Sequence, residues 1–263
     1  MISGLIVYSQ IDREKNTWFI NKCIDVLAEN DISLLYKEEK EVLDHIKKHK
    51  VDFVIFRARD YHLVEALEAK GIRCFNNALT NKTANDKYLT YQFLKKHNIP
   101  CLDSFLSFEE VMKTPLIMKS VDGHGGQEVF LVNSKEEADR IANSLKKRMI
   151  YQELCNNHED LRLYVLNKKV VGAVLRNNPS DYRSNYSLGG QVKAYQPEQE
   201  IVDIAESIAN LLDADFIGVD FIKNKKWCLN EIEDPVGSRM LYQTFQIDIV
   251  AQFANYIASC LKK

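Results

Sequence analysis

Two strand-like runs in the last quarter of the chain constrain its fold more than any other feature. Residues 218–222 and 227–233 are rich in β-branched and aromatic side chains, and a short polar break separates them. This pattern predicts an antiparallel hairpin with its turn near Asn224 and Lys225. Because side chains alternate along a strand, the hairpin also determines which residues share a face.

Three carboxylates fall on one face of this predicted hairpin. With a two-residue loop, Asp220 lies opposite Leu229. The period of two then places Glu231 and Glu233 on the same face as Asp220. Like charges gathered on a mostly apolar hairpin are unfavourable unless a cation neutralises them, and all-oxygen ligands suit Mg²⁺ or Mn²⁺. The alternative is a solvated edge face, since surface carboxylates are common.

The composition excludes several classes of partner. The chain has 263 residues, enough for two or three lobes with clefts between them. Its 35 Lys and Arg nearly balance its 37 Asp and Glu, so we expect no nucleic acid and no membrane among its partners. The absence of a signal peptide pattern and of a membrane-spanning run predicts a cytoplasmic protein. Six scattered cysteines fit reduced, buried thiols.

The first part of the chain has the pattern of an open α/β lobe. An apolar run at 4–8 precedes a helix-like pattern at 17–29, and residues 51–57 form a second strand-like run. Ligands gather at the carboxyl ends of strands in such lobes, which makes Arg57 and Arg59 candidates for contact with an anionic substrate. A surface salt bridge is the alternative for both arginines.

A glycine-rich loop between two strand-like runs is the next candidate. The loop 120–127 contains Gly123, Gly125 and Gly126, and Lys119 stands directly before it. Glycines let backbone N–H groups close over a phosphate, although an ordinary hairpin turn has the same composition. The adjacent lysine favours the phosphate role.

A second lysine, Lys87, stands in the first turn of the helix predicted over 84–97. A cation there is unfavourable against the helix dipole, which indicates an anion outside the helix. The sequence has neither a G-x-x-x-x-G-K-[ST] nor a G-x-G-x-x-G pattern, so P-loop and dinucleotide-binding folds are poorly supported.

Polar residues also flank the strands predicted in the second half. A hairpin over 161–175 carries Asp160 and Arg162 at its entry and Arg176 at its exit. A long irregular segment, 178–190, follows it and contains arginine and asparagine. Long loops of this composition are functional more often than not.

Three motifs give the most specific joint signature of the chain. They are Asp160-Leu161-Arg162, Asp181-Tyr182-Arg183-Ser184-Asn185 with Gly189-Gly190, and Gly218-Val219-Asp220. With the lysines and the glycine loop, their order resembles the ATP-grasp superfamily and, within it, the RimK-type carboxylate–amine ligases. The resemblance runs from about Val51 to the C-terminus. It implies an α/β fold with an N-terminal open α/β domain at 1–83, a central lobe with a glycine flap at 84–153, and a C-terminal lobe with a metal site at 154–263.

The resemblance also implies roles for individual residues. The residues implied to bind ATP are Lys87, Lys119, Gly123, Gly125, Gly126, Glu153, Leu154, Asp160 and Ser184. Those implied to surround the triphosphate and the reacting carboxylate are Arg176, Arg183 and Asn185. The implied ligands of Mg²⁺ or Mn²⁺ are Asp220, Glu231 and Glu233. Within the first set, the backbone of Glu153 and Leu154 would meet the adenine, and Asp160 would hold the ribose.

Two positions depart from the family pattern. Glu233 stands where the family commonly has Asn, and Glu128 stands where a glycine is expected near the end of the flap. The first change keeps an oxygen ligand and adds a charge. The second affects the geometry of the flap.

The function implied by the resemblance is ATP-dependent ligation of a carboxylate to an amine through an acylphosphate, with release of ADP and phosphate. The expected partners are ATP, a carboxylate substrate and an amine substrate, in the form of an amino acid, a peptide or a carrier protein. The oligomeric state is left open, a homo-oligomer included. Two alternatives remain: an ATP-dependent phosphotransferase on the same fold, and a nucleotide-binding regulatory protein without turnover.

Overall fold

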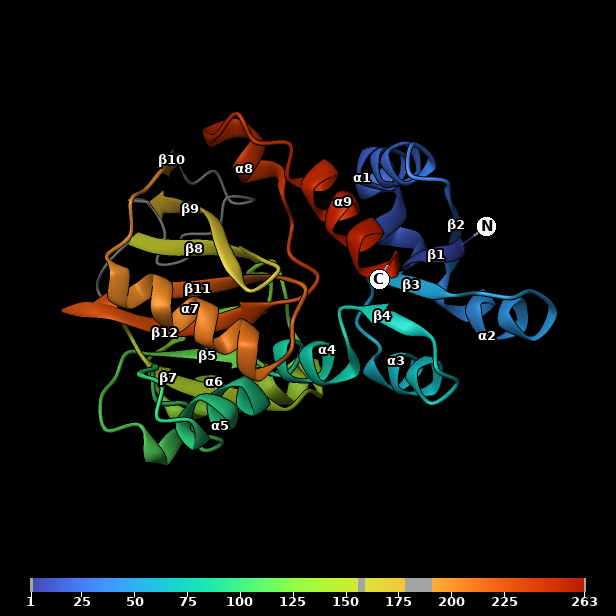
Figure 1. The fold of residues 1–263 in the computed structure, drawn as a ribbon. Helices are drawn as coiled ribbons and strands as arrows, with labels where there is room; N and C mark the ends of the chain where they lie inside the picture. Colours follow the sequence, from blue (N-terminus) through green and yellow to red (C-terminus); the bar gives the residue numbers. More distant parts are fainter. Residues whose placement is uncertain (1, 156–158, 178–190, 263) are drawn as a thin grey trace.

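Three β-sheets organise the molecule, and each is built from a different part of the sequence (Figure 1). The computed structural model describes residues 2–155, 159–177 and 191–262. Within these ranges, no helix has the length and apolar character that crossing a membrane requires.

The N-terminal sheet is parallel, with the strand order β2-β1-β3-β4. Its strands are β1 (Ile2–Tyr8), β2 (Ile32–Glu38), β3 (Phe53–Phe56) and β4 (Arg73–Phe75), and the helices between them are α1 (Gln10–Ala28), α2 (Glu39–Lys48) and α3 (Tyr61–Glu68). Every residue of β3 is buried, because α1 packs on one face of the sheet and α2 and α3 on the other. The open α/β lobe is therefore confirmed, although the sequence pattern does not predict β2 or β4.

The central sheet is antiparallel, with the order β6-β5-β7. Its strands are β5 (Leu116–Ser120), β6 (Val129–Val132) and β7 (Met149–Glu153), and beside them lie the helix α6 (Lys135–Leu145) and the 3₁₀ helix η1 (Phe108–Glu110). The glycine-rich loop joins β5 to β6, and Lys119 pairs with Val129 across the two strands. The loop is thus the turn of a hairpin, as predicted.

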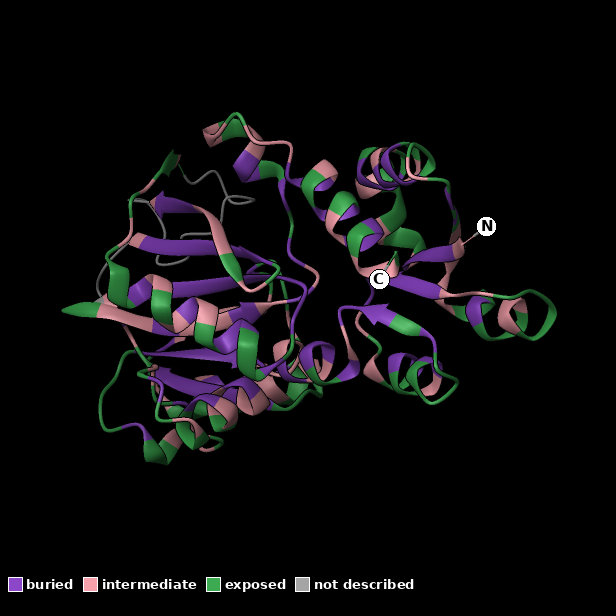
Figure 2. Ribbon diagram, viewed as in Figure 1, coloured by how far each residue is buried: buried purple, intermediate pink, exposed green. Residues whose placement is uncertain are grey.

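The C-terminal sheet is antiparallel, with the order β10-β9-β8-β11-β12. Its strands are β8 (Glu159–Leu166), β9 (Lys169–Asn177), β10 (Gln191–Ala194), β11 (Phe216–Asn224) and β12 (Lys226–Glu233). Helix α7 (Gln199–Leu211) crosses this sheet and buries Ile201, Ala205 and Ile208 against it. Leu94 of α5 (Lys87–Lys96) joins the same core. Figure 2 shows the buried residues concentrated on the strands and on the inward sides of the helices.

The last part of the chain returns to the N-terminal sheet. Helices α4 (Ala78–Ala84) and α8 (Arg239–Thr244) flank the junction, and α9 (Ile249–Leu261) packs against α1. The buried carboxylate of Asp234 accepts hydrogen bonds from the side chains of Asn76 at 2.8 Å and Asn81 at 2.9 Å. The end of β12 is therefore fixed to the N-terminal lobe.

The hairpin of β11 and β12 has a different register from the predicted one. Its turn contains one residue, Lys225, rather than two. Phe221 therefore lies opposite Leu229, where the sequence pattern places Asp220. A β-bulge then inserts one extra residue, so that Asp220 pairs with Glu231. The shorter turn and the bulge together shift the pairing by two positions. Asp220, Glu231 and Glu233 therefore lie on one face of the hairpin, as predicted.

Candidate active site

One cavity of about 790 Å³ is lined by residues from all three lobes. Every predicted site residue that the structure describes lines it. These residues are Lys87, Lys119, Gly123, Gly125, Gly126, Glu153, Leu154, Asp160, Arg176, Asp220, Glu231 and Glu233. The remaining three, Arg183, Ser184 and Asn185, lie outside the described residues.

Lys119 provides a fixed positive charge on the wall of this cavity. Its side chain is buried at the end of β5. Its Nζ donates to Oδ1 of Asn230 at 3.1 Å and lies 3.4 Å from Oε1 of Glu231. These two acceptors stand at the bulge of β12, where successive side chains reach the same lysine. The pairing offsets the cost of burying the ammonium group beside the flap.

The glycine flap is held over the cavity by Lys87. Its Nζ donates to the backbone carbonyl of Gly123. Gly125 and Gly126 have φ angles of 67° and 76°, which non-glycine residues rarely adopt. A side chain at Gly123 would collide with the hydroxyl of Ser120. Gly125 and Gly126 are thus required by their backbone conformation, and Gly123 is required because a side chain would not fit there.

Glu128 fixes the base of the flap. Its carboxylate accepts hydrogen bonds from the hydroxyl of Ser120 and from Nζ of Lys147, which lies 3.0 Å away. These two hydrogen bonds hold the pKa of Glu128 below its usual range. The departure from glycine therefore adds anchoring contacts at this position.

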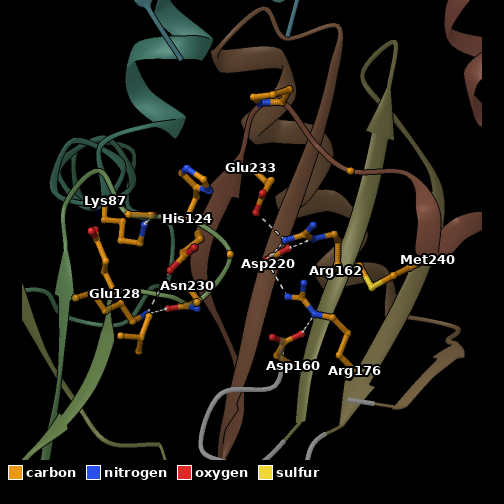
Figure 3. A pocket seen from close by; sticks show the side chains of 18 of the residues that line it. Lys87, His124, Glu128, Asp160, Arg162, Arg176, Asp220, Asn230, Glu233 and Met240 are labelled. Atoms are coloured by element: carbon orange, nitrogen blue, oxygen red, sulfur yellow. Dashed lines mark hydrogen bonds and ion pairs between the residues drawn. The ribbon is translucent and has the colours of Figure 1, made fainter. Parts of the chain in front are cut away.

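An ion network joins four strands of the C-terminal sheet (Figure 3). Arg162 on β8 donates from Nε and Nη2 to the two carboxylate oxygens of Asp220 on β11, each at 2.7 Å. Its Nη2 also lies 2.7 Å from Oε2 of Glu233 on β12. Arg176 on β9 donates to Asp220 at 2.8 Å and to Asp160. Two cations thus bind three carboxylates.

Burial and neighbouring charges set the ionisation of this network. Burial raises the pKa of Asp160 to about 6, although the charge of Arg176 opposes this shift. Burial also opposes ionisation of Asp220, but Arg162 and Arg176 together hold the pKa of its carboxyl well below the usual range. Asp220 is therefore anionic at neutral pH.

The donors available to a divalent cation are all oxygen atoms, which fits Mg²⁺ or Mn²⁺ in kind. Asp220 and Glu231 face each other across the hairpin, and Glu233 follows on the same face. In the part of the chain that the structure describes, no three His, Cys, Asp or Glu side chains already form a metal-binding group. Arg162 holds Asp220 and Glu233, and Lys119 holds Glu231. Coordination by all three would require these ion pairs to rearrange.

The end of β7 forms a more apolar wall. Glu153 and Leu154 line the cavity there together with Leu102 and Ile117. Apolar side chains beside backbone polar groups suit a flat heteroaromatic ring. This position agrees with the predicted adenine contact, which stays a prediction.

Arg57 and Arg59 line the N-terminal side of the same cavity. Arg57 is buried, donates to the carbonyl of Val236 at 2.6 Å, and lies 4.6 Å from the ring centre of Phe19. Arg57 therefore connects the N-terminal lobe to the segment that follows β12. Arg59 lies 3.4 Å from the carboxylate of Asp12 and is half-buried.

Arg162, Asn230 and His124 also line the cavity, and the sequence motifs assign none of them a role. A place for Arg162 in the site could have been predicted, because it stands two residues after Asp160 and so shares its strand face. Asn230 could not, because its position depends on the bulge. His124 lies between flap glycines, and burial, followed by the charge of Arg59, lowers the pKa of its imidazole.

Known proteins resemble this chain in sequence and in fold. A model of the RimK-like ATP-grasp domain matches residues 84–257. The chain belongs to this family. This family consists of ATP-grasp ligases of the carboxylate–amine class, so the cavity is the candidate active site of such a ligase.

Two curated relatives extend this finding. An uncharacterized protein of Mycoplasma pneumoniae is 28% identical over 244 residues, which covers 90% of this chain and 86% of the relative. A probable alpha-L-glutamate ligase of Haemophilus influenzae is 29% identical over 210 residues, covering 74% and 70%.

The solved structure of the ATP-grasp ligase PsnB, in complex with a variant of its minimal precursor, Mg and ADP, has a TM-score of 0.70 and 14% identity. The match covers 98% of this chain and 97% of PsnB. This likeness confirms the ATP-grasp fold over nearly the full length of the chain.

Proposed function

We propose that this ATP-grasp protein joins a carboxylate to an amine through an acylphosphate and releases ADP and phosphate. The substrates would be amino acids, peptides or a carrier protein. The observation that carries the proposal is the convergence of both lysines, the flap glycines, the ion network and the predicted metal ligands on one cavity. A regulatory protein without turnover would bind nucleotide but would form no ADP.

The first step transfers a phosphoryl group. An oxygen of the substrate carboxylate attacks the γ-phosphorus, the bond to the β–γ bridging oxygen breaks, and ADP leaves. Lys119 and Arg176 would offset the negative charge of the transferred group. Lys87 would keep the flap closed through Gly123, which excludes water from the acylphosphate.

A divalent cation would be held by Asp220, Glu231 and Glu233 and would neutralise charge on the phosphate oxygens. In the second step, the amine attacks the acyl carbon, the bond to the phosphate oxygen breaks, and phosphate leaves. The amine loses a proton, and an amide remains. Water must be excluded in this step too, since hydrolysis would regenerate the carboxylate.

The proposal is tested by supplying hydroxylamine with Mg²⁺, ATP and a panel of carboxylates. We expect ADP, phosphate and a hydroxamate in equal amounts with at least one carboxylate. Arg162→Lys is a matched variant that keeps the charge but loses the two-pronged contact with Asp220, and it should be much slower. Release of AMP would contradict the proposal, and so would a phosphorylated product that hydroxylamine does not convert.

A further inference from the structure

The glycine flap carries one side chain that the phosphoryl transfer described above does not use. His124 stands between Gly123 and Gly125, and it lines the cavity. In Figure 3 its ring is drawn between Lys87 and Glu233, and the charges of both residues act on it. Because Lys87 is predicted to bind ATP and Glu233 to bind the metal, the ring faces the place where the proposed acylphosphate would form.

The imidazole of His124 is free and unprotonated at neutral pH. Among the described residues, neither of its ring nitrogens takes part in a hydrogen bond. Partial burial, followed by the charge of Arg59, lowers the pKa of the ring, and Lys87 adds to this effect. The residue also keeps exposed surface, so a substrate can reach it. A neutral imidazole has one nitrogen that can take up a proton.

The other titratable groups of the cavity are less suited to accept a proton. Asp12, Glu128 and Glu233 interact with the ring of His124, but each forms an ion pair with a lysine or arginine. Glu153 pairs with Leu116 at the start of β5, whereas the flap follows the end of that strand. Burial raises the pKa of the described tyrosines and of the cysteine that line the cavity, so these groups keep their protons. The remaining carboxylates are also paired: Asp160 with Arg176, Asp220 with Arg162, and Glu231 with Lys119.

The amide-forming step needs a proton acceptor inside the cavity. An alkylamine is present at neutral pH mainly as an ammonium ion, so it loses one proton before it attacks and a second one as the amide forms. The closed flap excludes the water that would otherwise take up the second proton. A side chain of the protein can replace that water as a general base.

We propose that His124 accepts this proton from the attacking amine, which rests on the proposed ligase function. The amine nitrogen bonds to the acyl carbon, an N–H proton passes to the imidazole, and the bond between the acyl carbon and the phosphate oxygen breaks. The imidazolium then gives the proton to the released phosphate, which leaves as hydrogen phosphate. His124 is thus a catalytic residue of the second step alone.

Two nucleophiles of nearly equal size separate this role from others. Hydroxylamine has an oxygen where methylamine has a methyl carbon, but it is the much weaker base and reaches the acylphosphate without its extra proton. Both are supplied together with Mg²⁺, ATP and the carboxylate that reacts with hydroxylamine. The ratio of N-methylamide to hydroxamate is measured by mass spectrometry. This ratio does not depend on how fast the acylphosphate forms.

His124→Gln keeps a polar side chain that takes up no proton. We expect it to lower the ratio roughly 100-fold, a typical contribution of general base catalysis, while hydroxamate formation and ADP affinity stay close to those of the wild type. The advantage of the wild type should disappear as the pH falls, since an imidazolium cannot accept a proton. His62→Gln is the matched control, because His62 is exposed on α3 and lies outside the cavity wall.

Equal ratios in the wild type and His124→Gln would overturn the inference, because the phosphate itself would then take the proton. A parallel loss of both products would also overturn it, since His124 would then act in phosphoryl transfer. So would a wild type that forms hydroxamate but no N-methylamide. These three results leave the ligase proposal intact. No product from the wild type with any carboxylate would reject the ligase itself, and the role of His124 with it.

Discussion

At the scale of single residues, substitution of Lys119 gives the clearest test of nucleotide binding. Lys119→Ala removes the buried ammonium group beside the flap, whereas Lys47→Ala removes an exposed one on α2. Loss of a charge-assisted contact with phosphate costs about 1.5–3 kcal/mol. We therefore expect ADP affinity to fall at least tenfold for Lys119→Ala and to stay unchanged for Lys47→Ala, as measured by calorimetry in Mg²⁺. Equal affinities would remove the phosphate role.

Glu233 tests the predicted metal site. Glu233→Asn keeps an oxygen acceptor near Arg162 but removes one negative charge, so turnover should persist with a Mg²⁺ requirement raised roughly tenfold. Glu233→Ala removes the acceptor as well and should cost more. The measurement is the Mg²⁺ dependence of turnover and of ADP affinity. If the curves of the wild type and both variants superimpose, Glu233 is not a metal ligand.

Residue types and short spacings predict many of the side chains that line the cavity. Lysines beside glycines and alternating carboxylates predict a phosphate and metal site before any fold is known. The network around Arg162 is harder to predict, because Asp220 meets it across two strands that are far apart in the sequence. The pairing between β8 and β11 decides that contact, and no local pattern encodes it.

At the scale of elements, the flap depends on a tight approach between Gly123 and Ser120. A methyl group at Gly123 would collide with the Ser120 hydroxyl and disturb its bond to Glu128. Overpacking costs about 1–3 kcal/mol, so Gly123→Ala should lower kcat/KM roughly tenfold. The Ser120→Ala background removes the closer of two collisions, since Oε2 of Glu128 would still lie 2.9 Å from the added methyl group, and should reduce this loss. Additive effects of the two substitutions would show that the approach is unimportant.

The hairpin shows where sequence patterns stop being informative. The alternation of side chains correctly predicts that Asp220 and Glu231 share a face. The shorter turn and the bulge together shift the pairing by two residues, which leaves each side chain on its predicted face. The facing pairs are predicted wrongly, since neither the one-residue turn at Lys225 nor the bulge has a distinct signature. Strand β2 is missed because its charged end merges with the charged helix α2.

At the scale of the whole molecule, Asp215 links the C-terminal sheet to the N-terminal lobe. Its Oδ1 accepts hydrogen bonds from Arg73 at 2.8 Å and Tyr256 at 2.7 Å. Burial raises the pKa of Asp215 from 3.8 to about 6, against the charge of Arg73. The native state therefore holds this proton more tightly than the unfolded state, and the associated stability is lost as pH rises from about 4 to 6.

The Asp215→Asn variant should not show this loss, because its side chain does not titrate. Between pH 4 and 6.5, the free energy of unfolding of the wild type should fall by about 2 kcal/mol relative to that of the variant. Denaturant unfolding at several pH values measures the difference. Asp160 titrates in the same range in both proteins and so cancels. Parallel stability profiles would show that Asp215 is not perturbed.

Transfer of an oxygen isotope tests whether a carboxylate oxygen of the substrate attacks ATP. The carboxylate that reacts with hydroxylamine is labelled with ¹⁸O, and the reaction is run with hydroxylamine, ATP and Mg²⁺. We expect one ¹⁸O atom in the released phosphate for each hydroxamate formed, with ADP as the nucleotide product. Unlabelled phosphate, or AMP carrying the label, would contradict it.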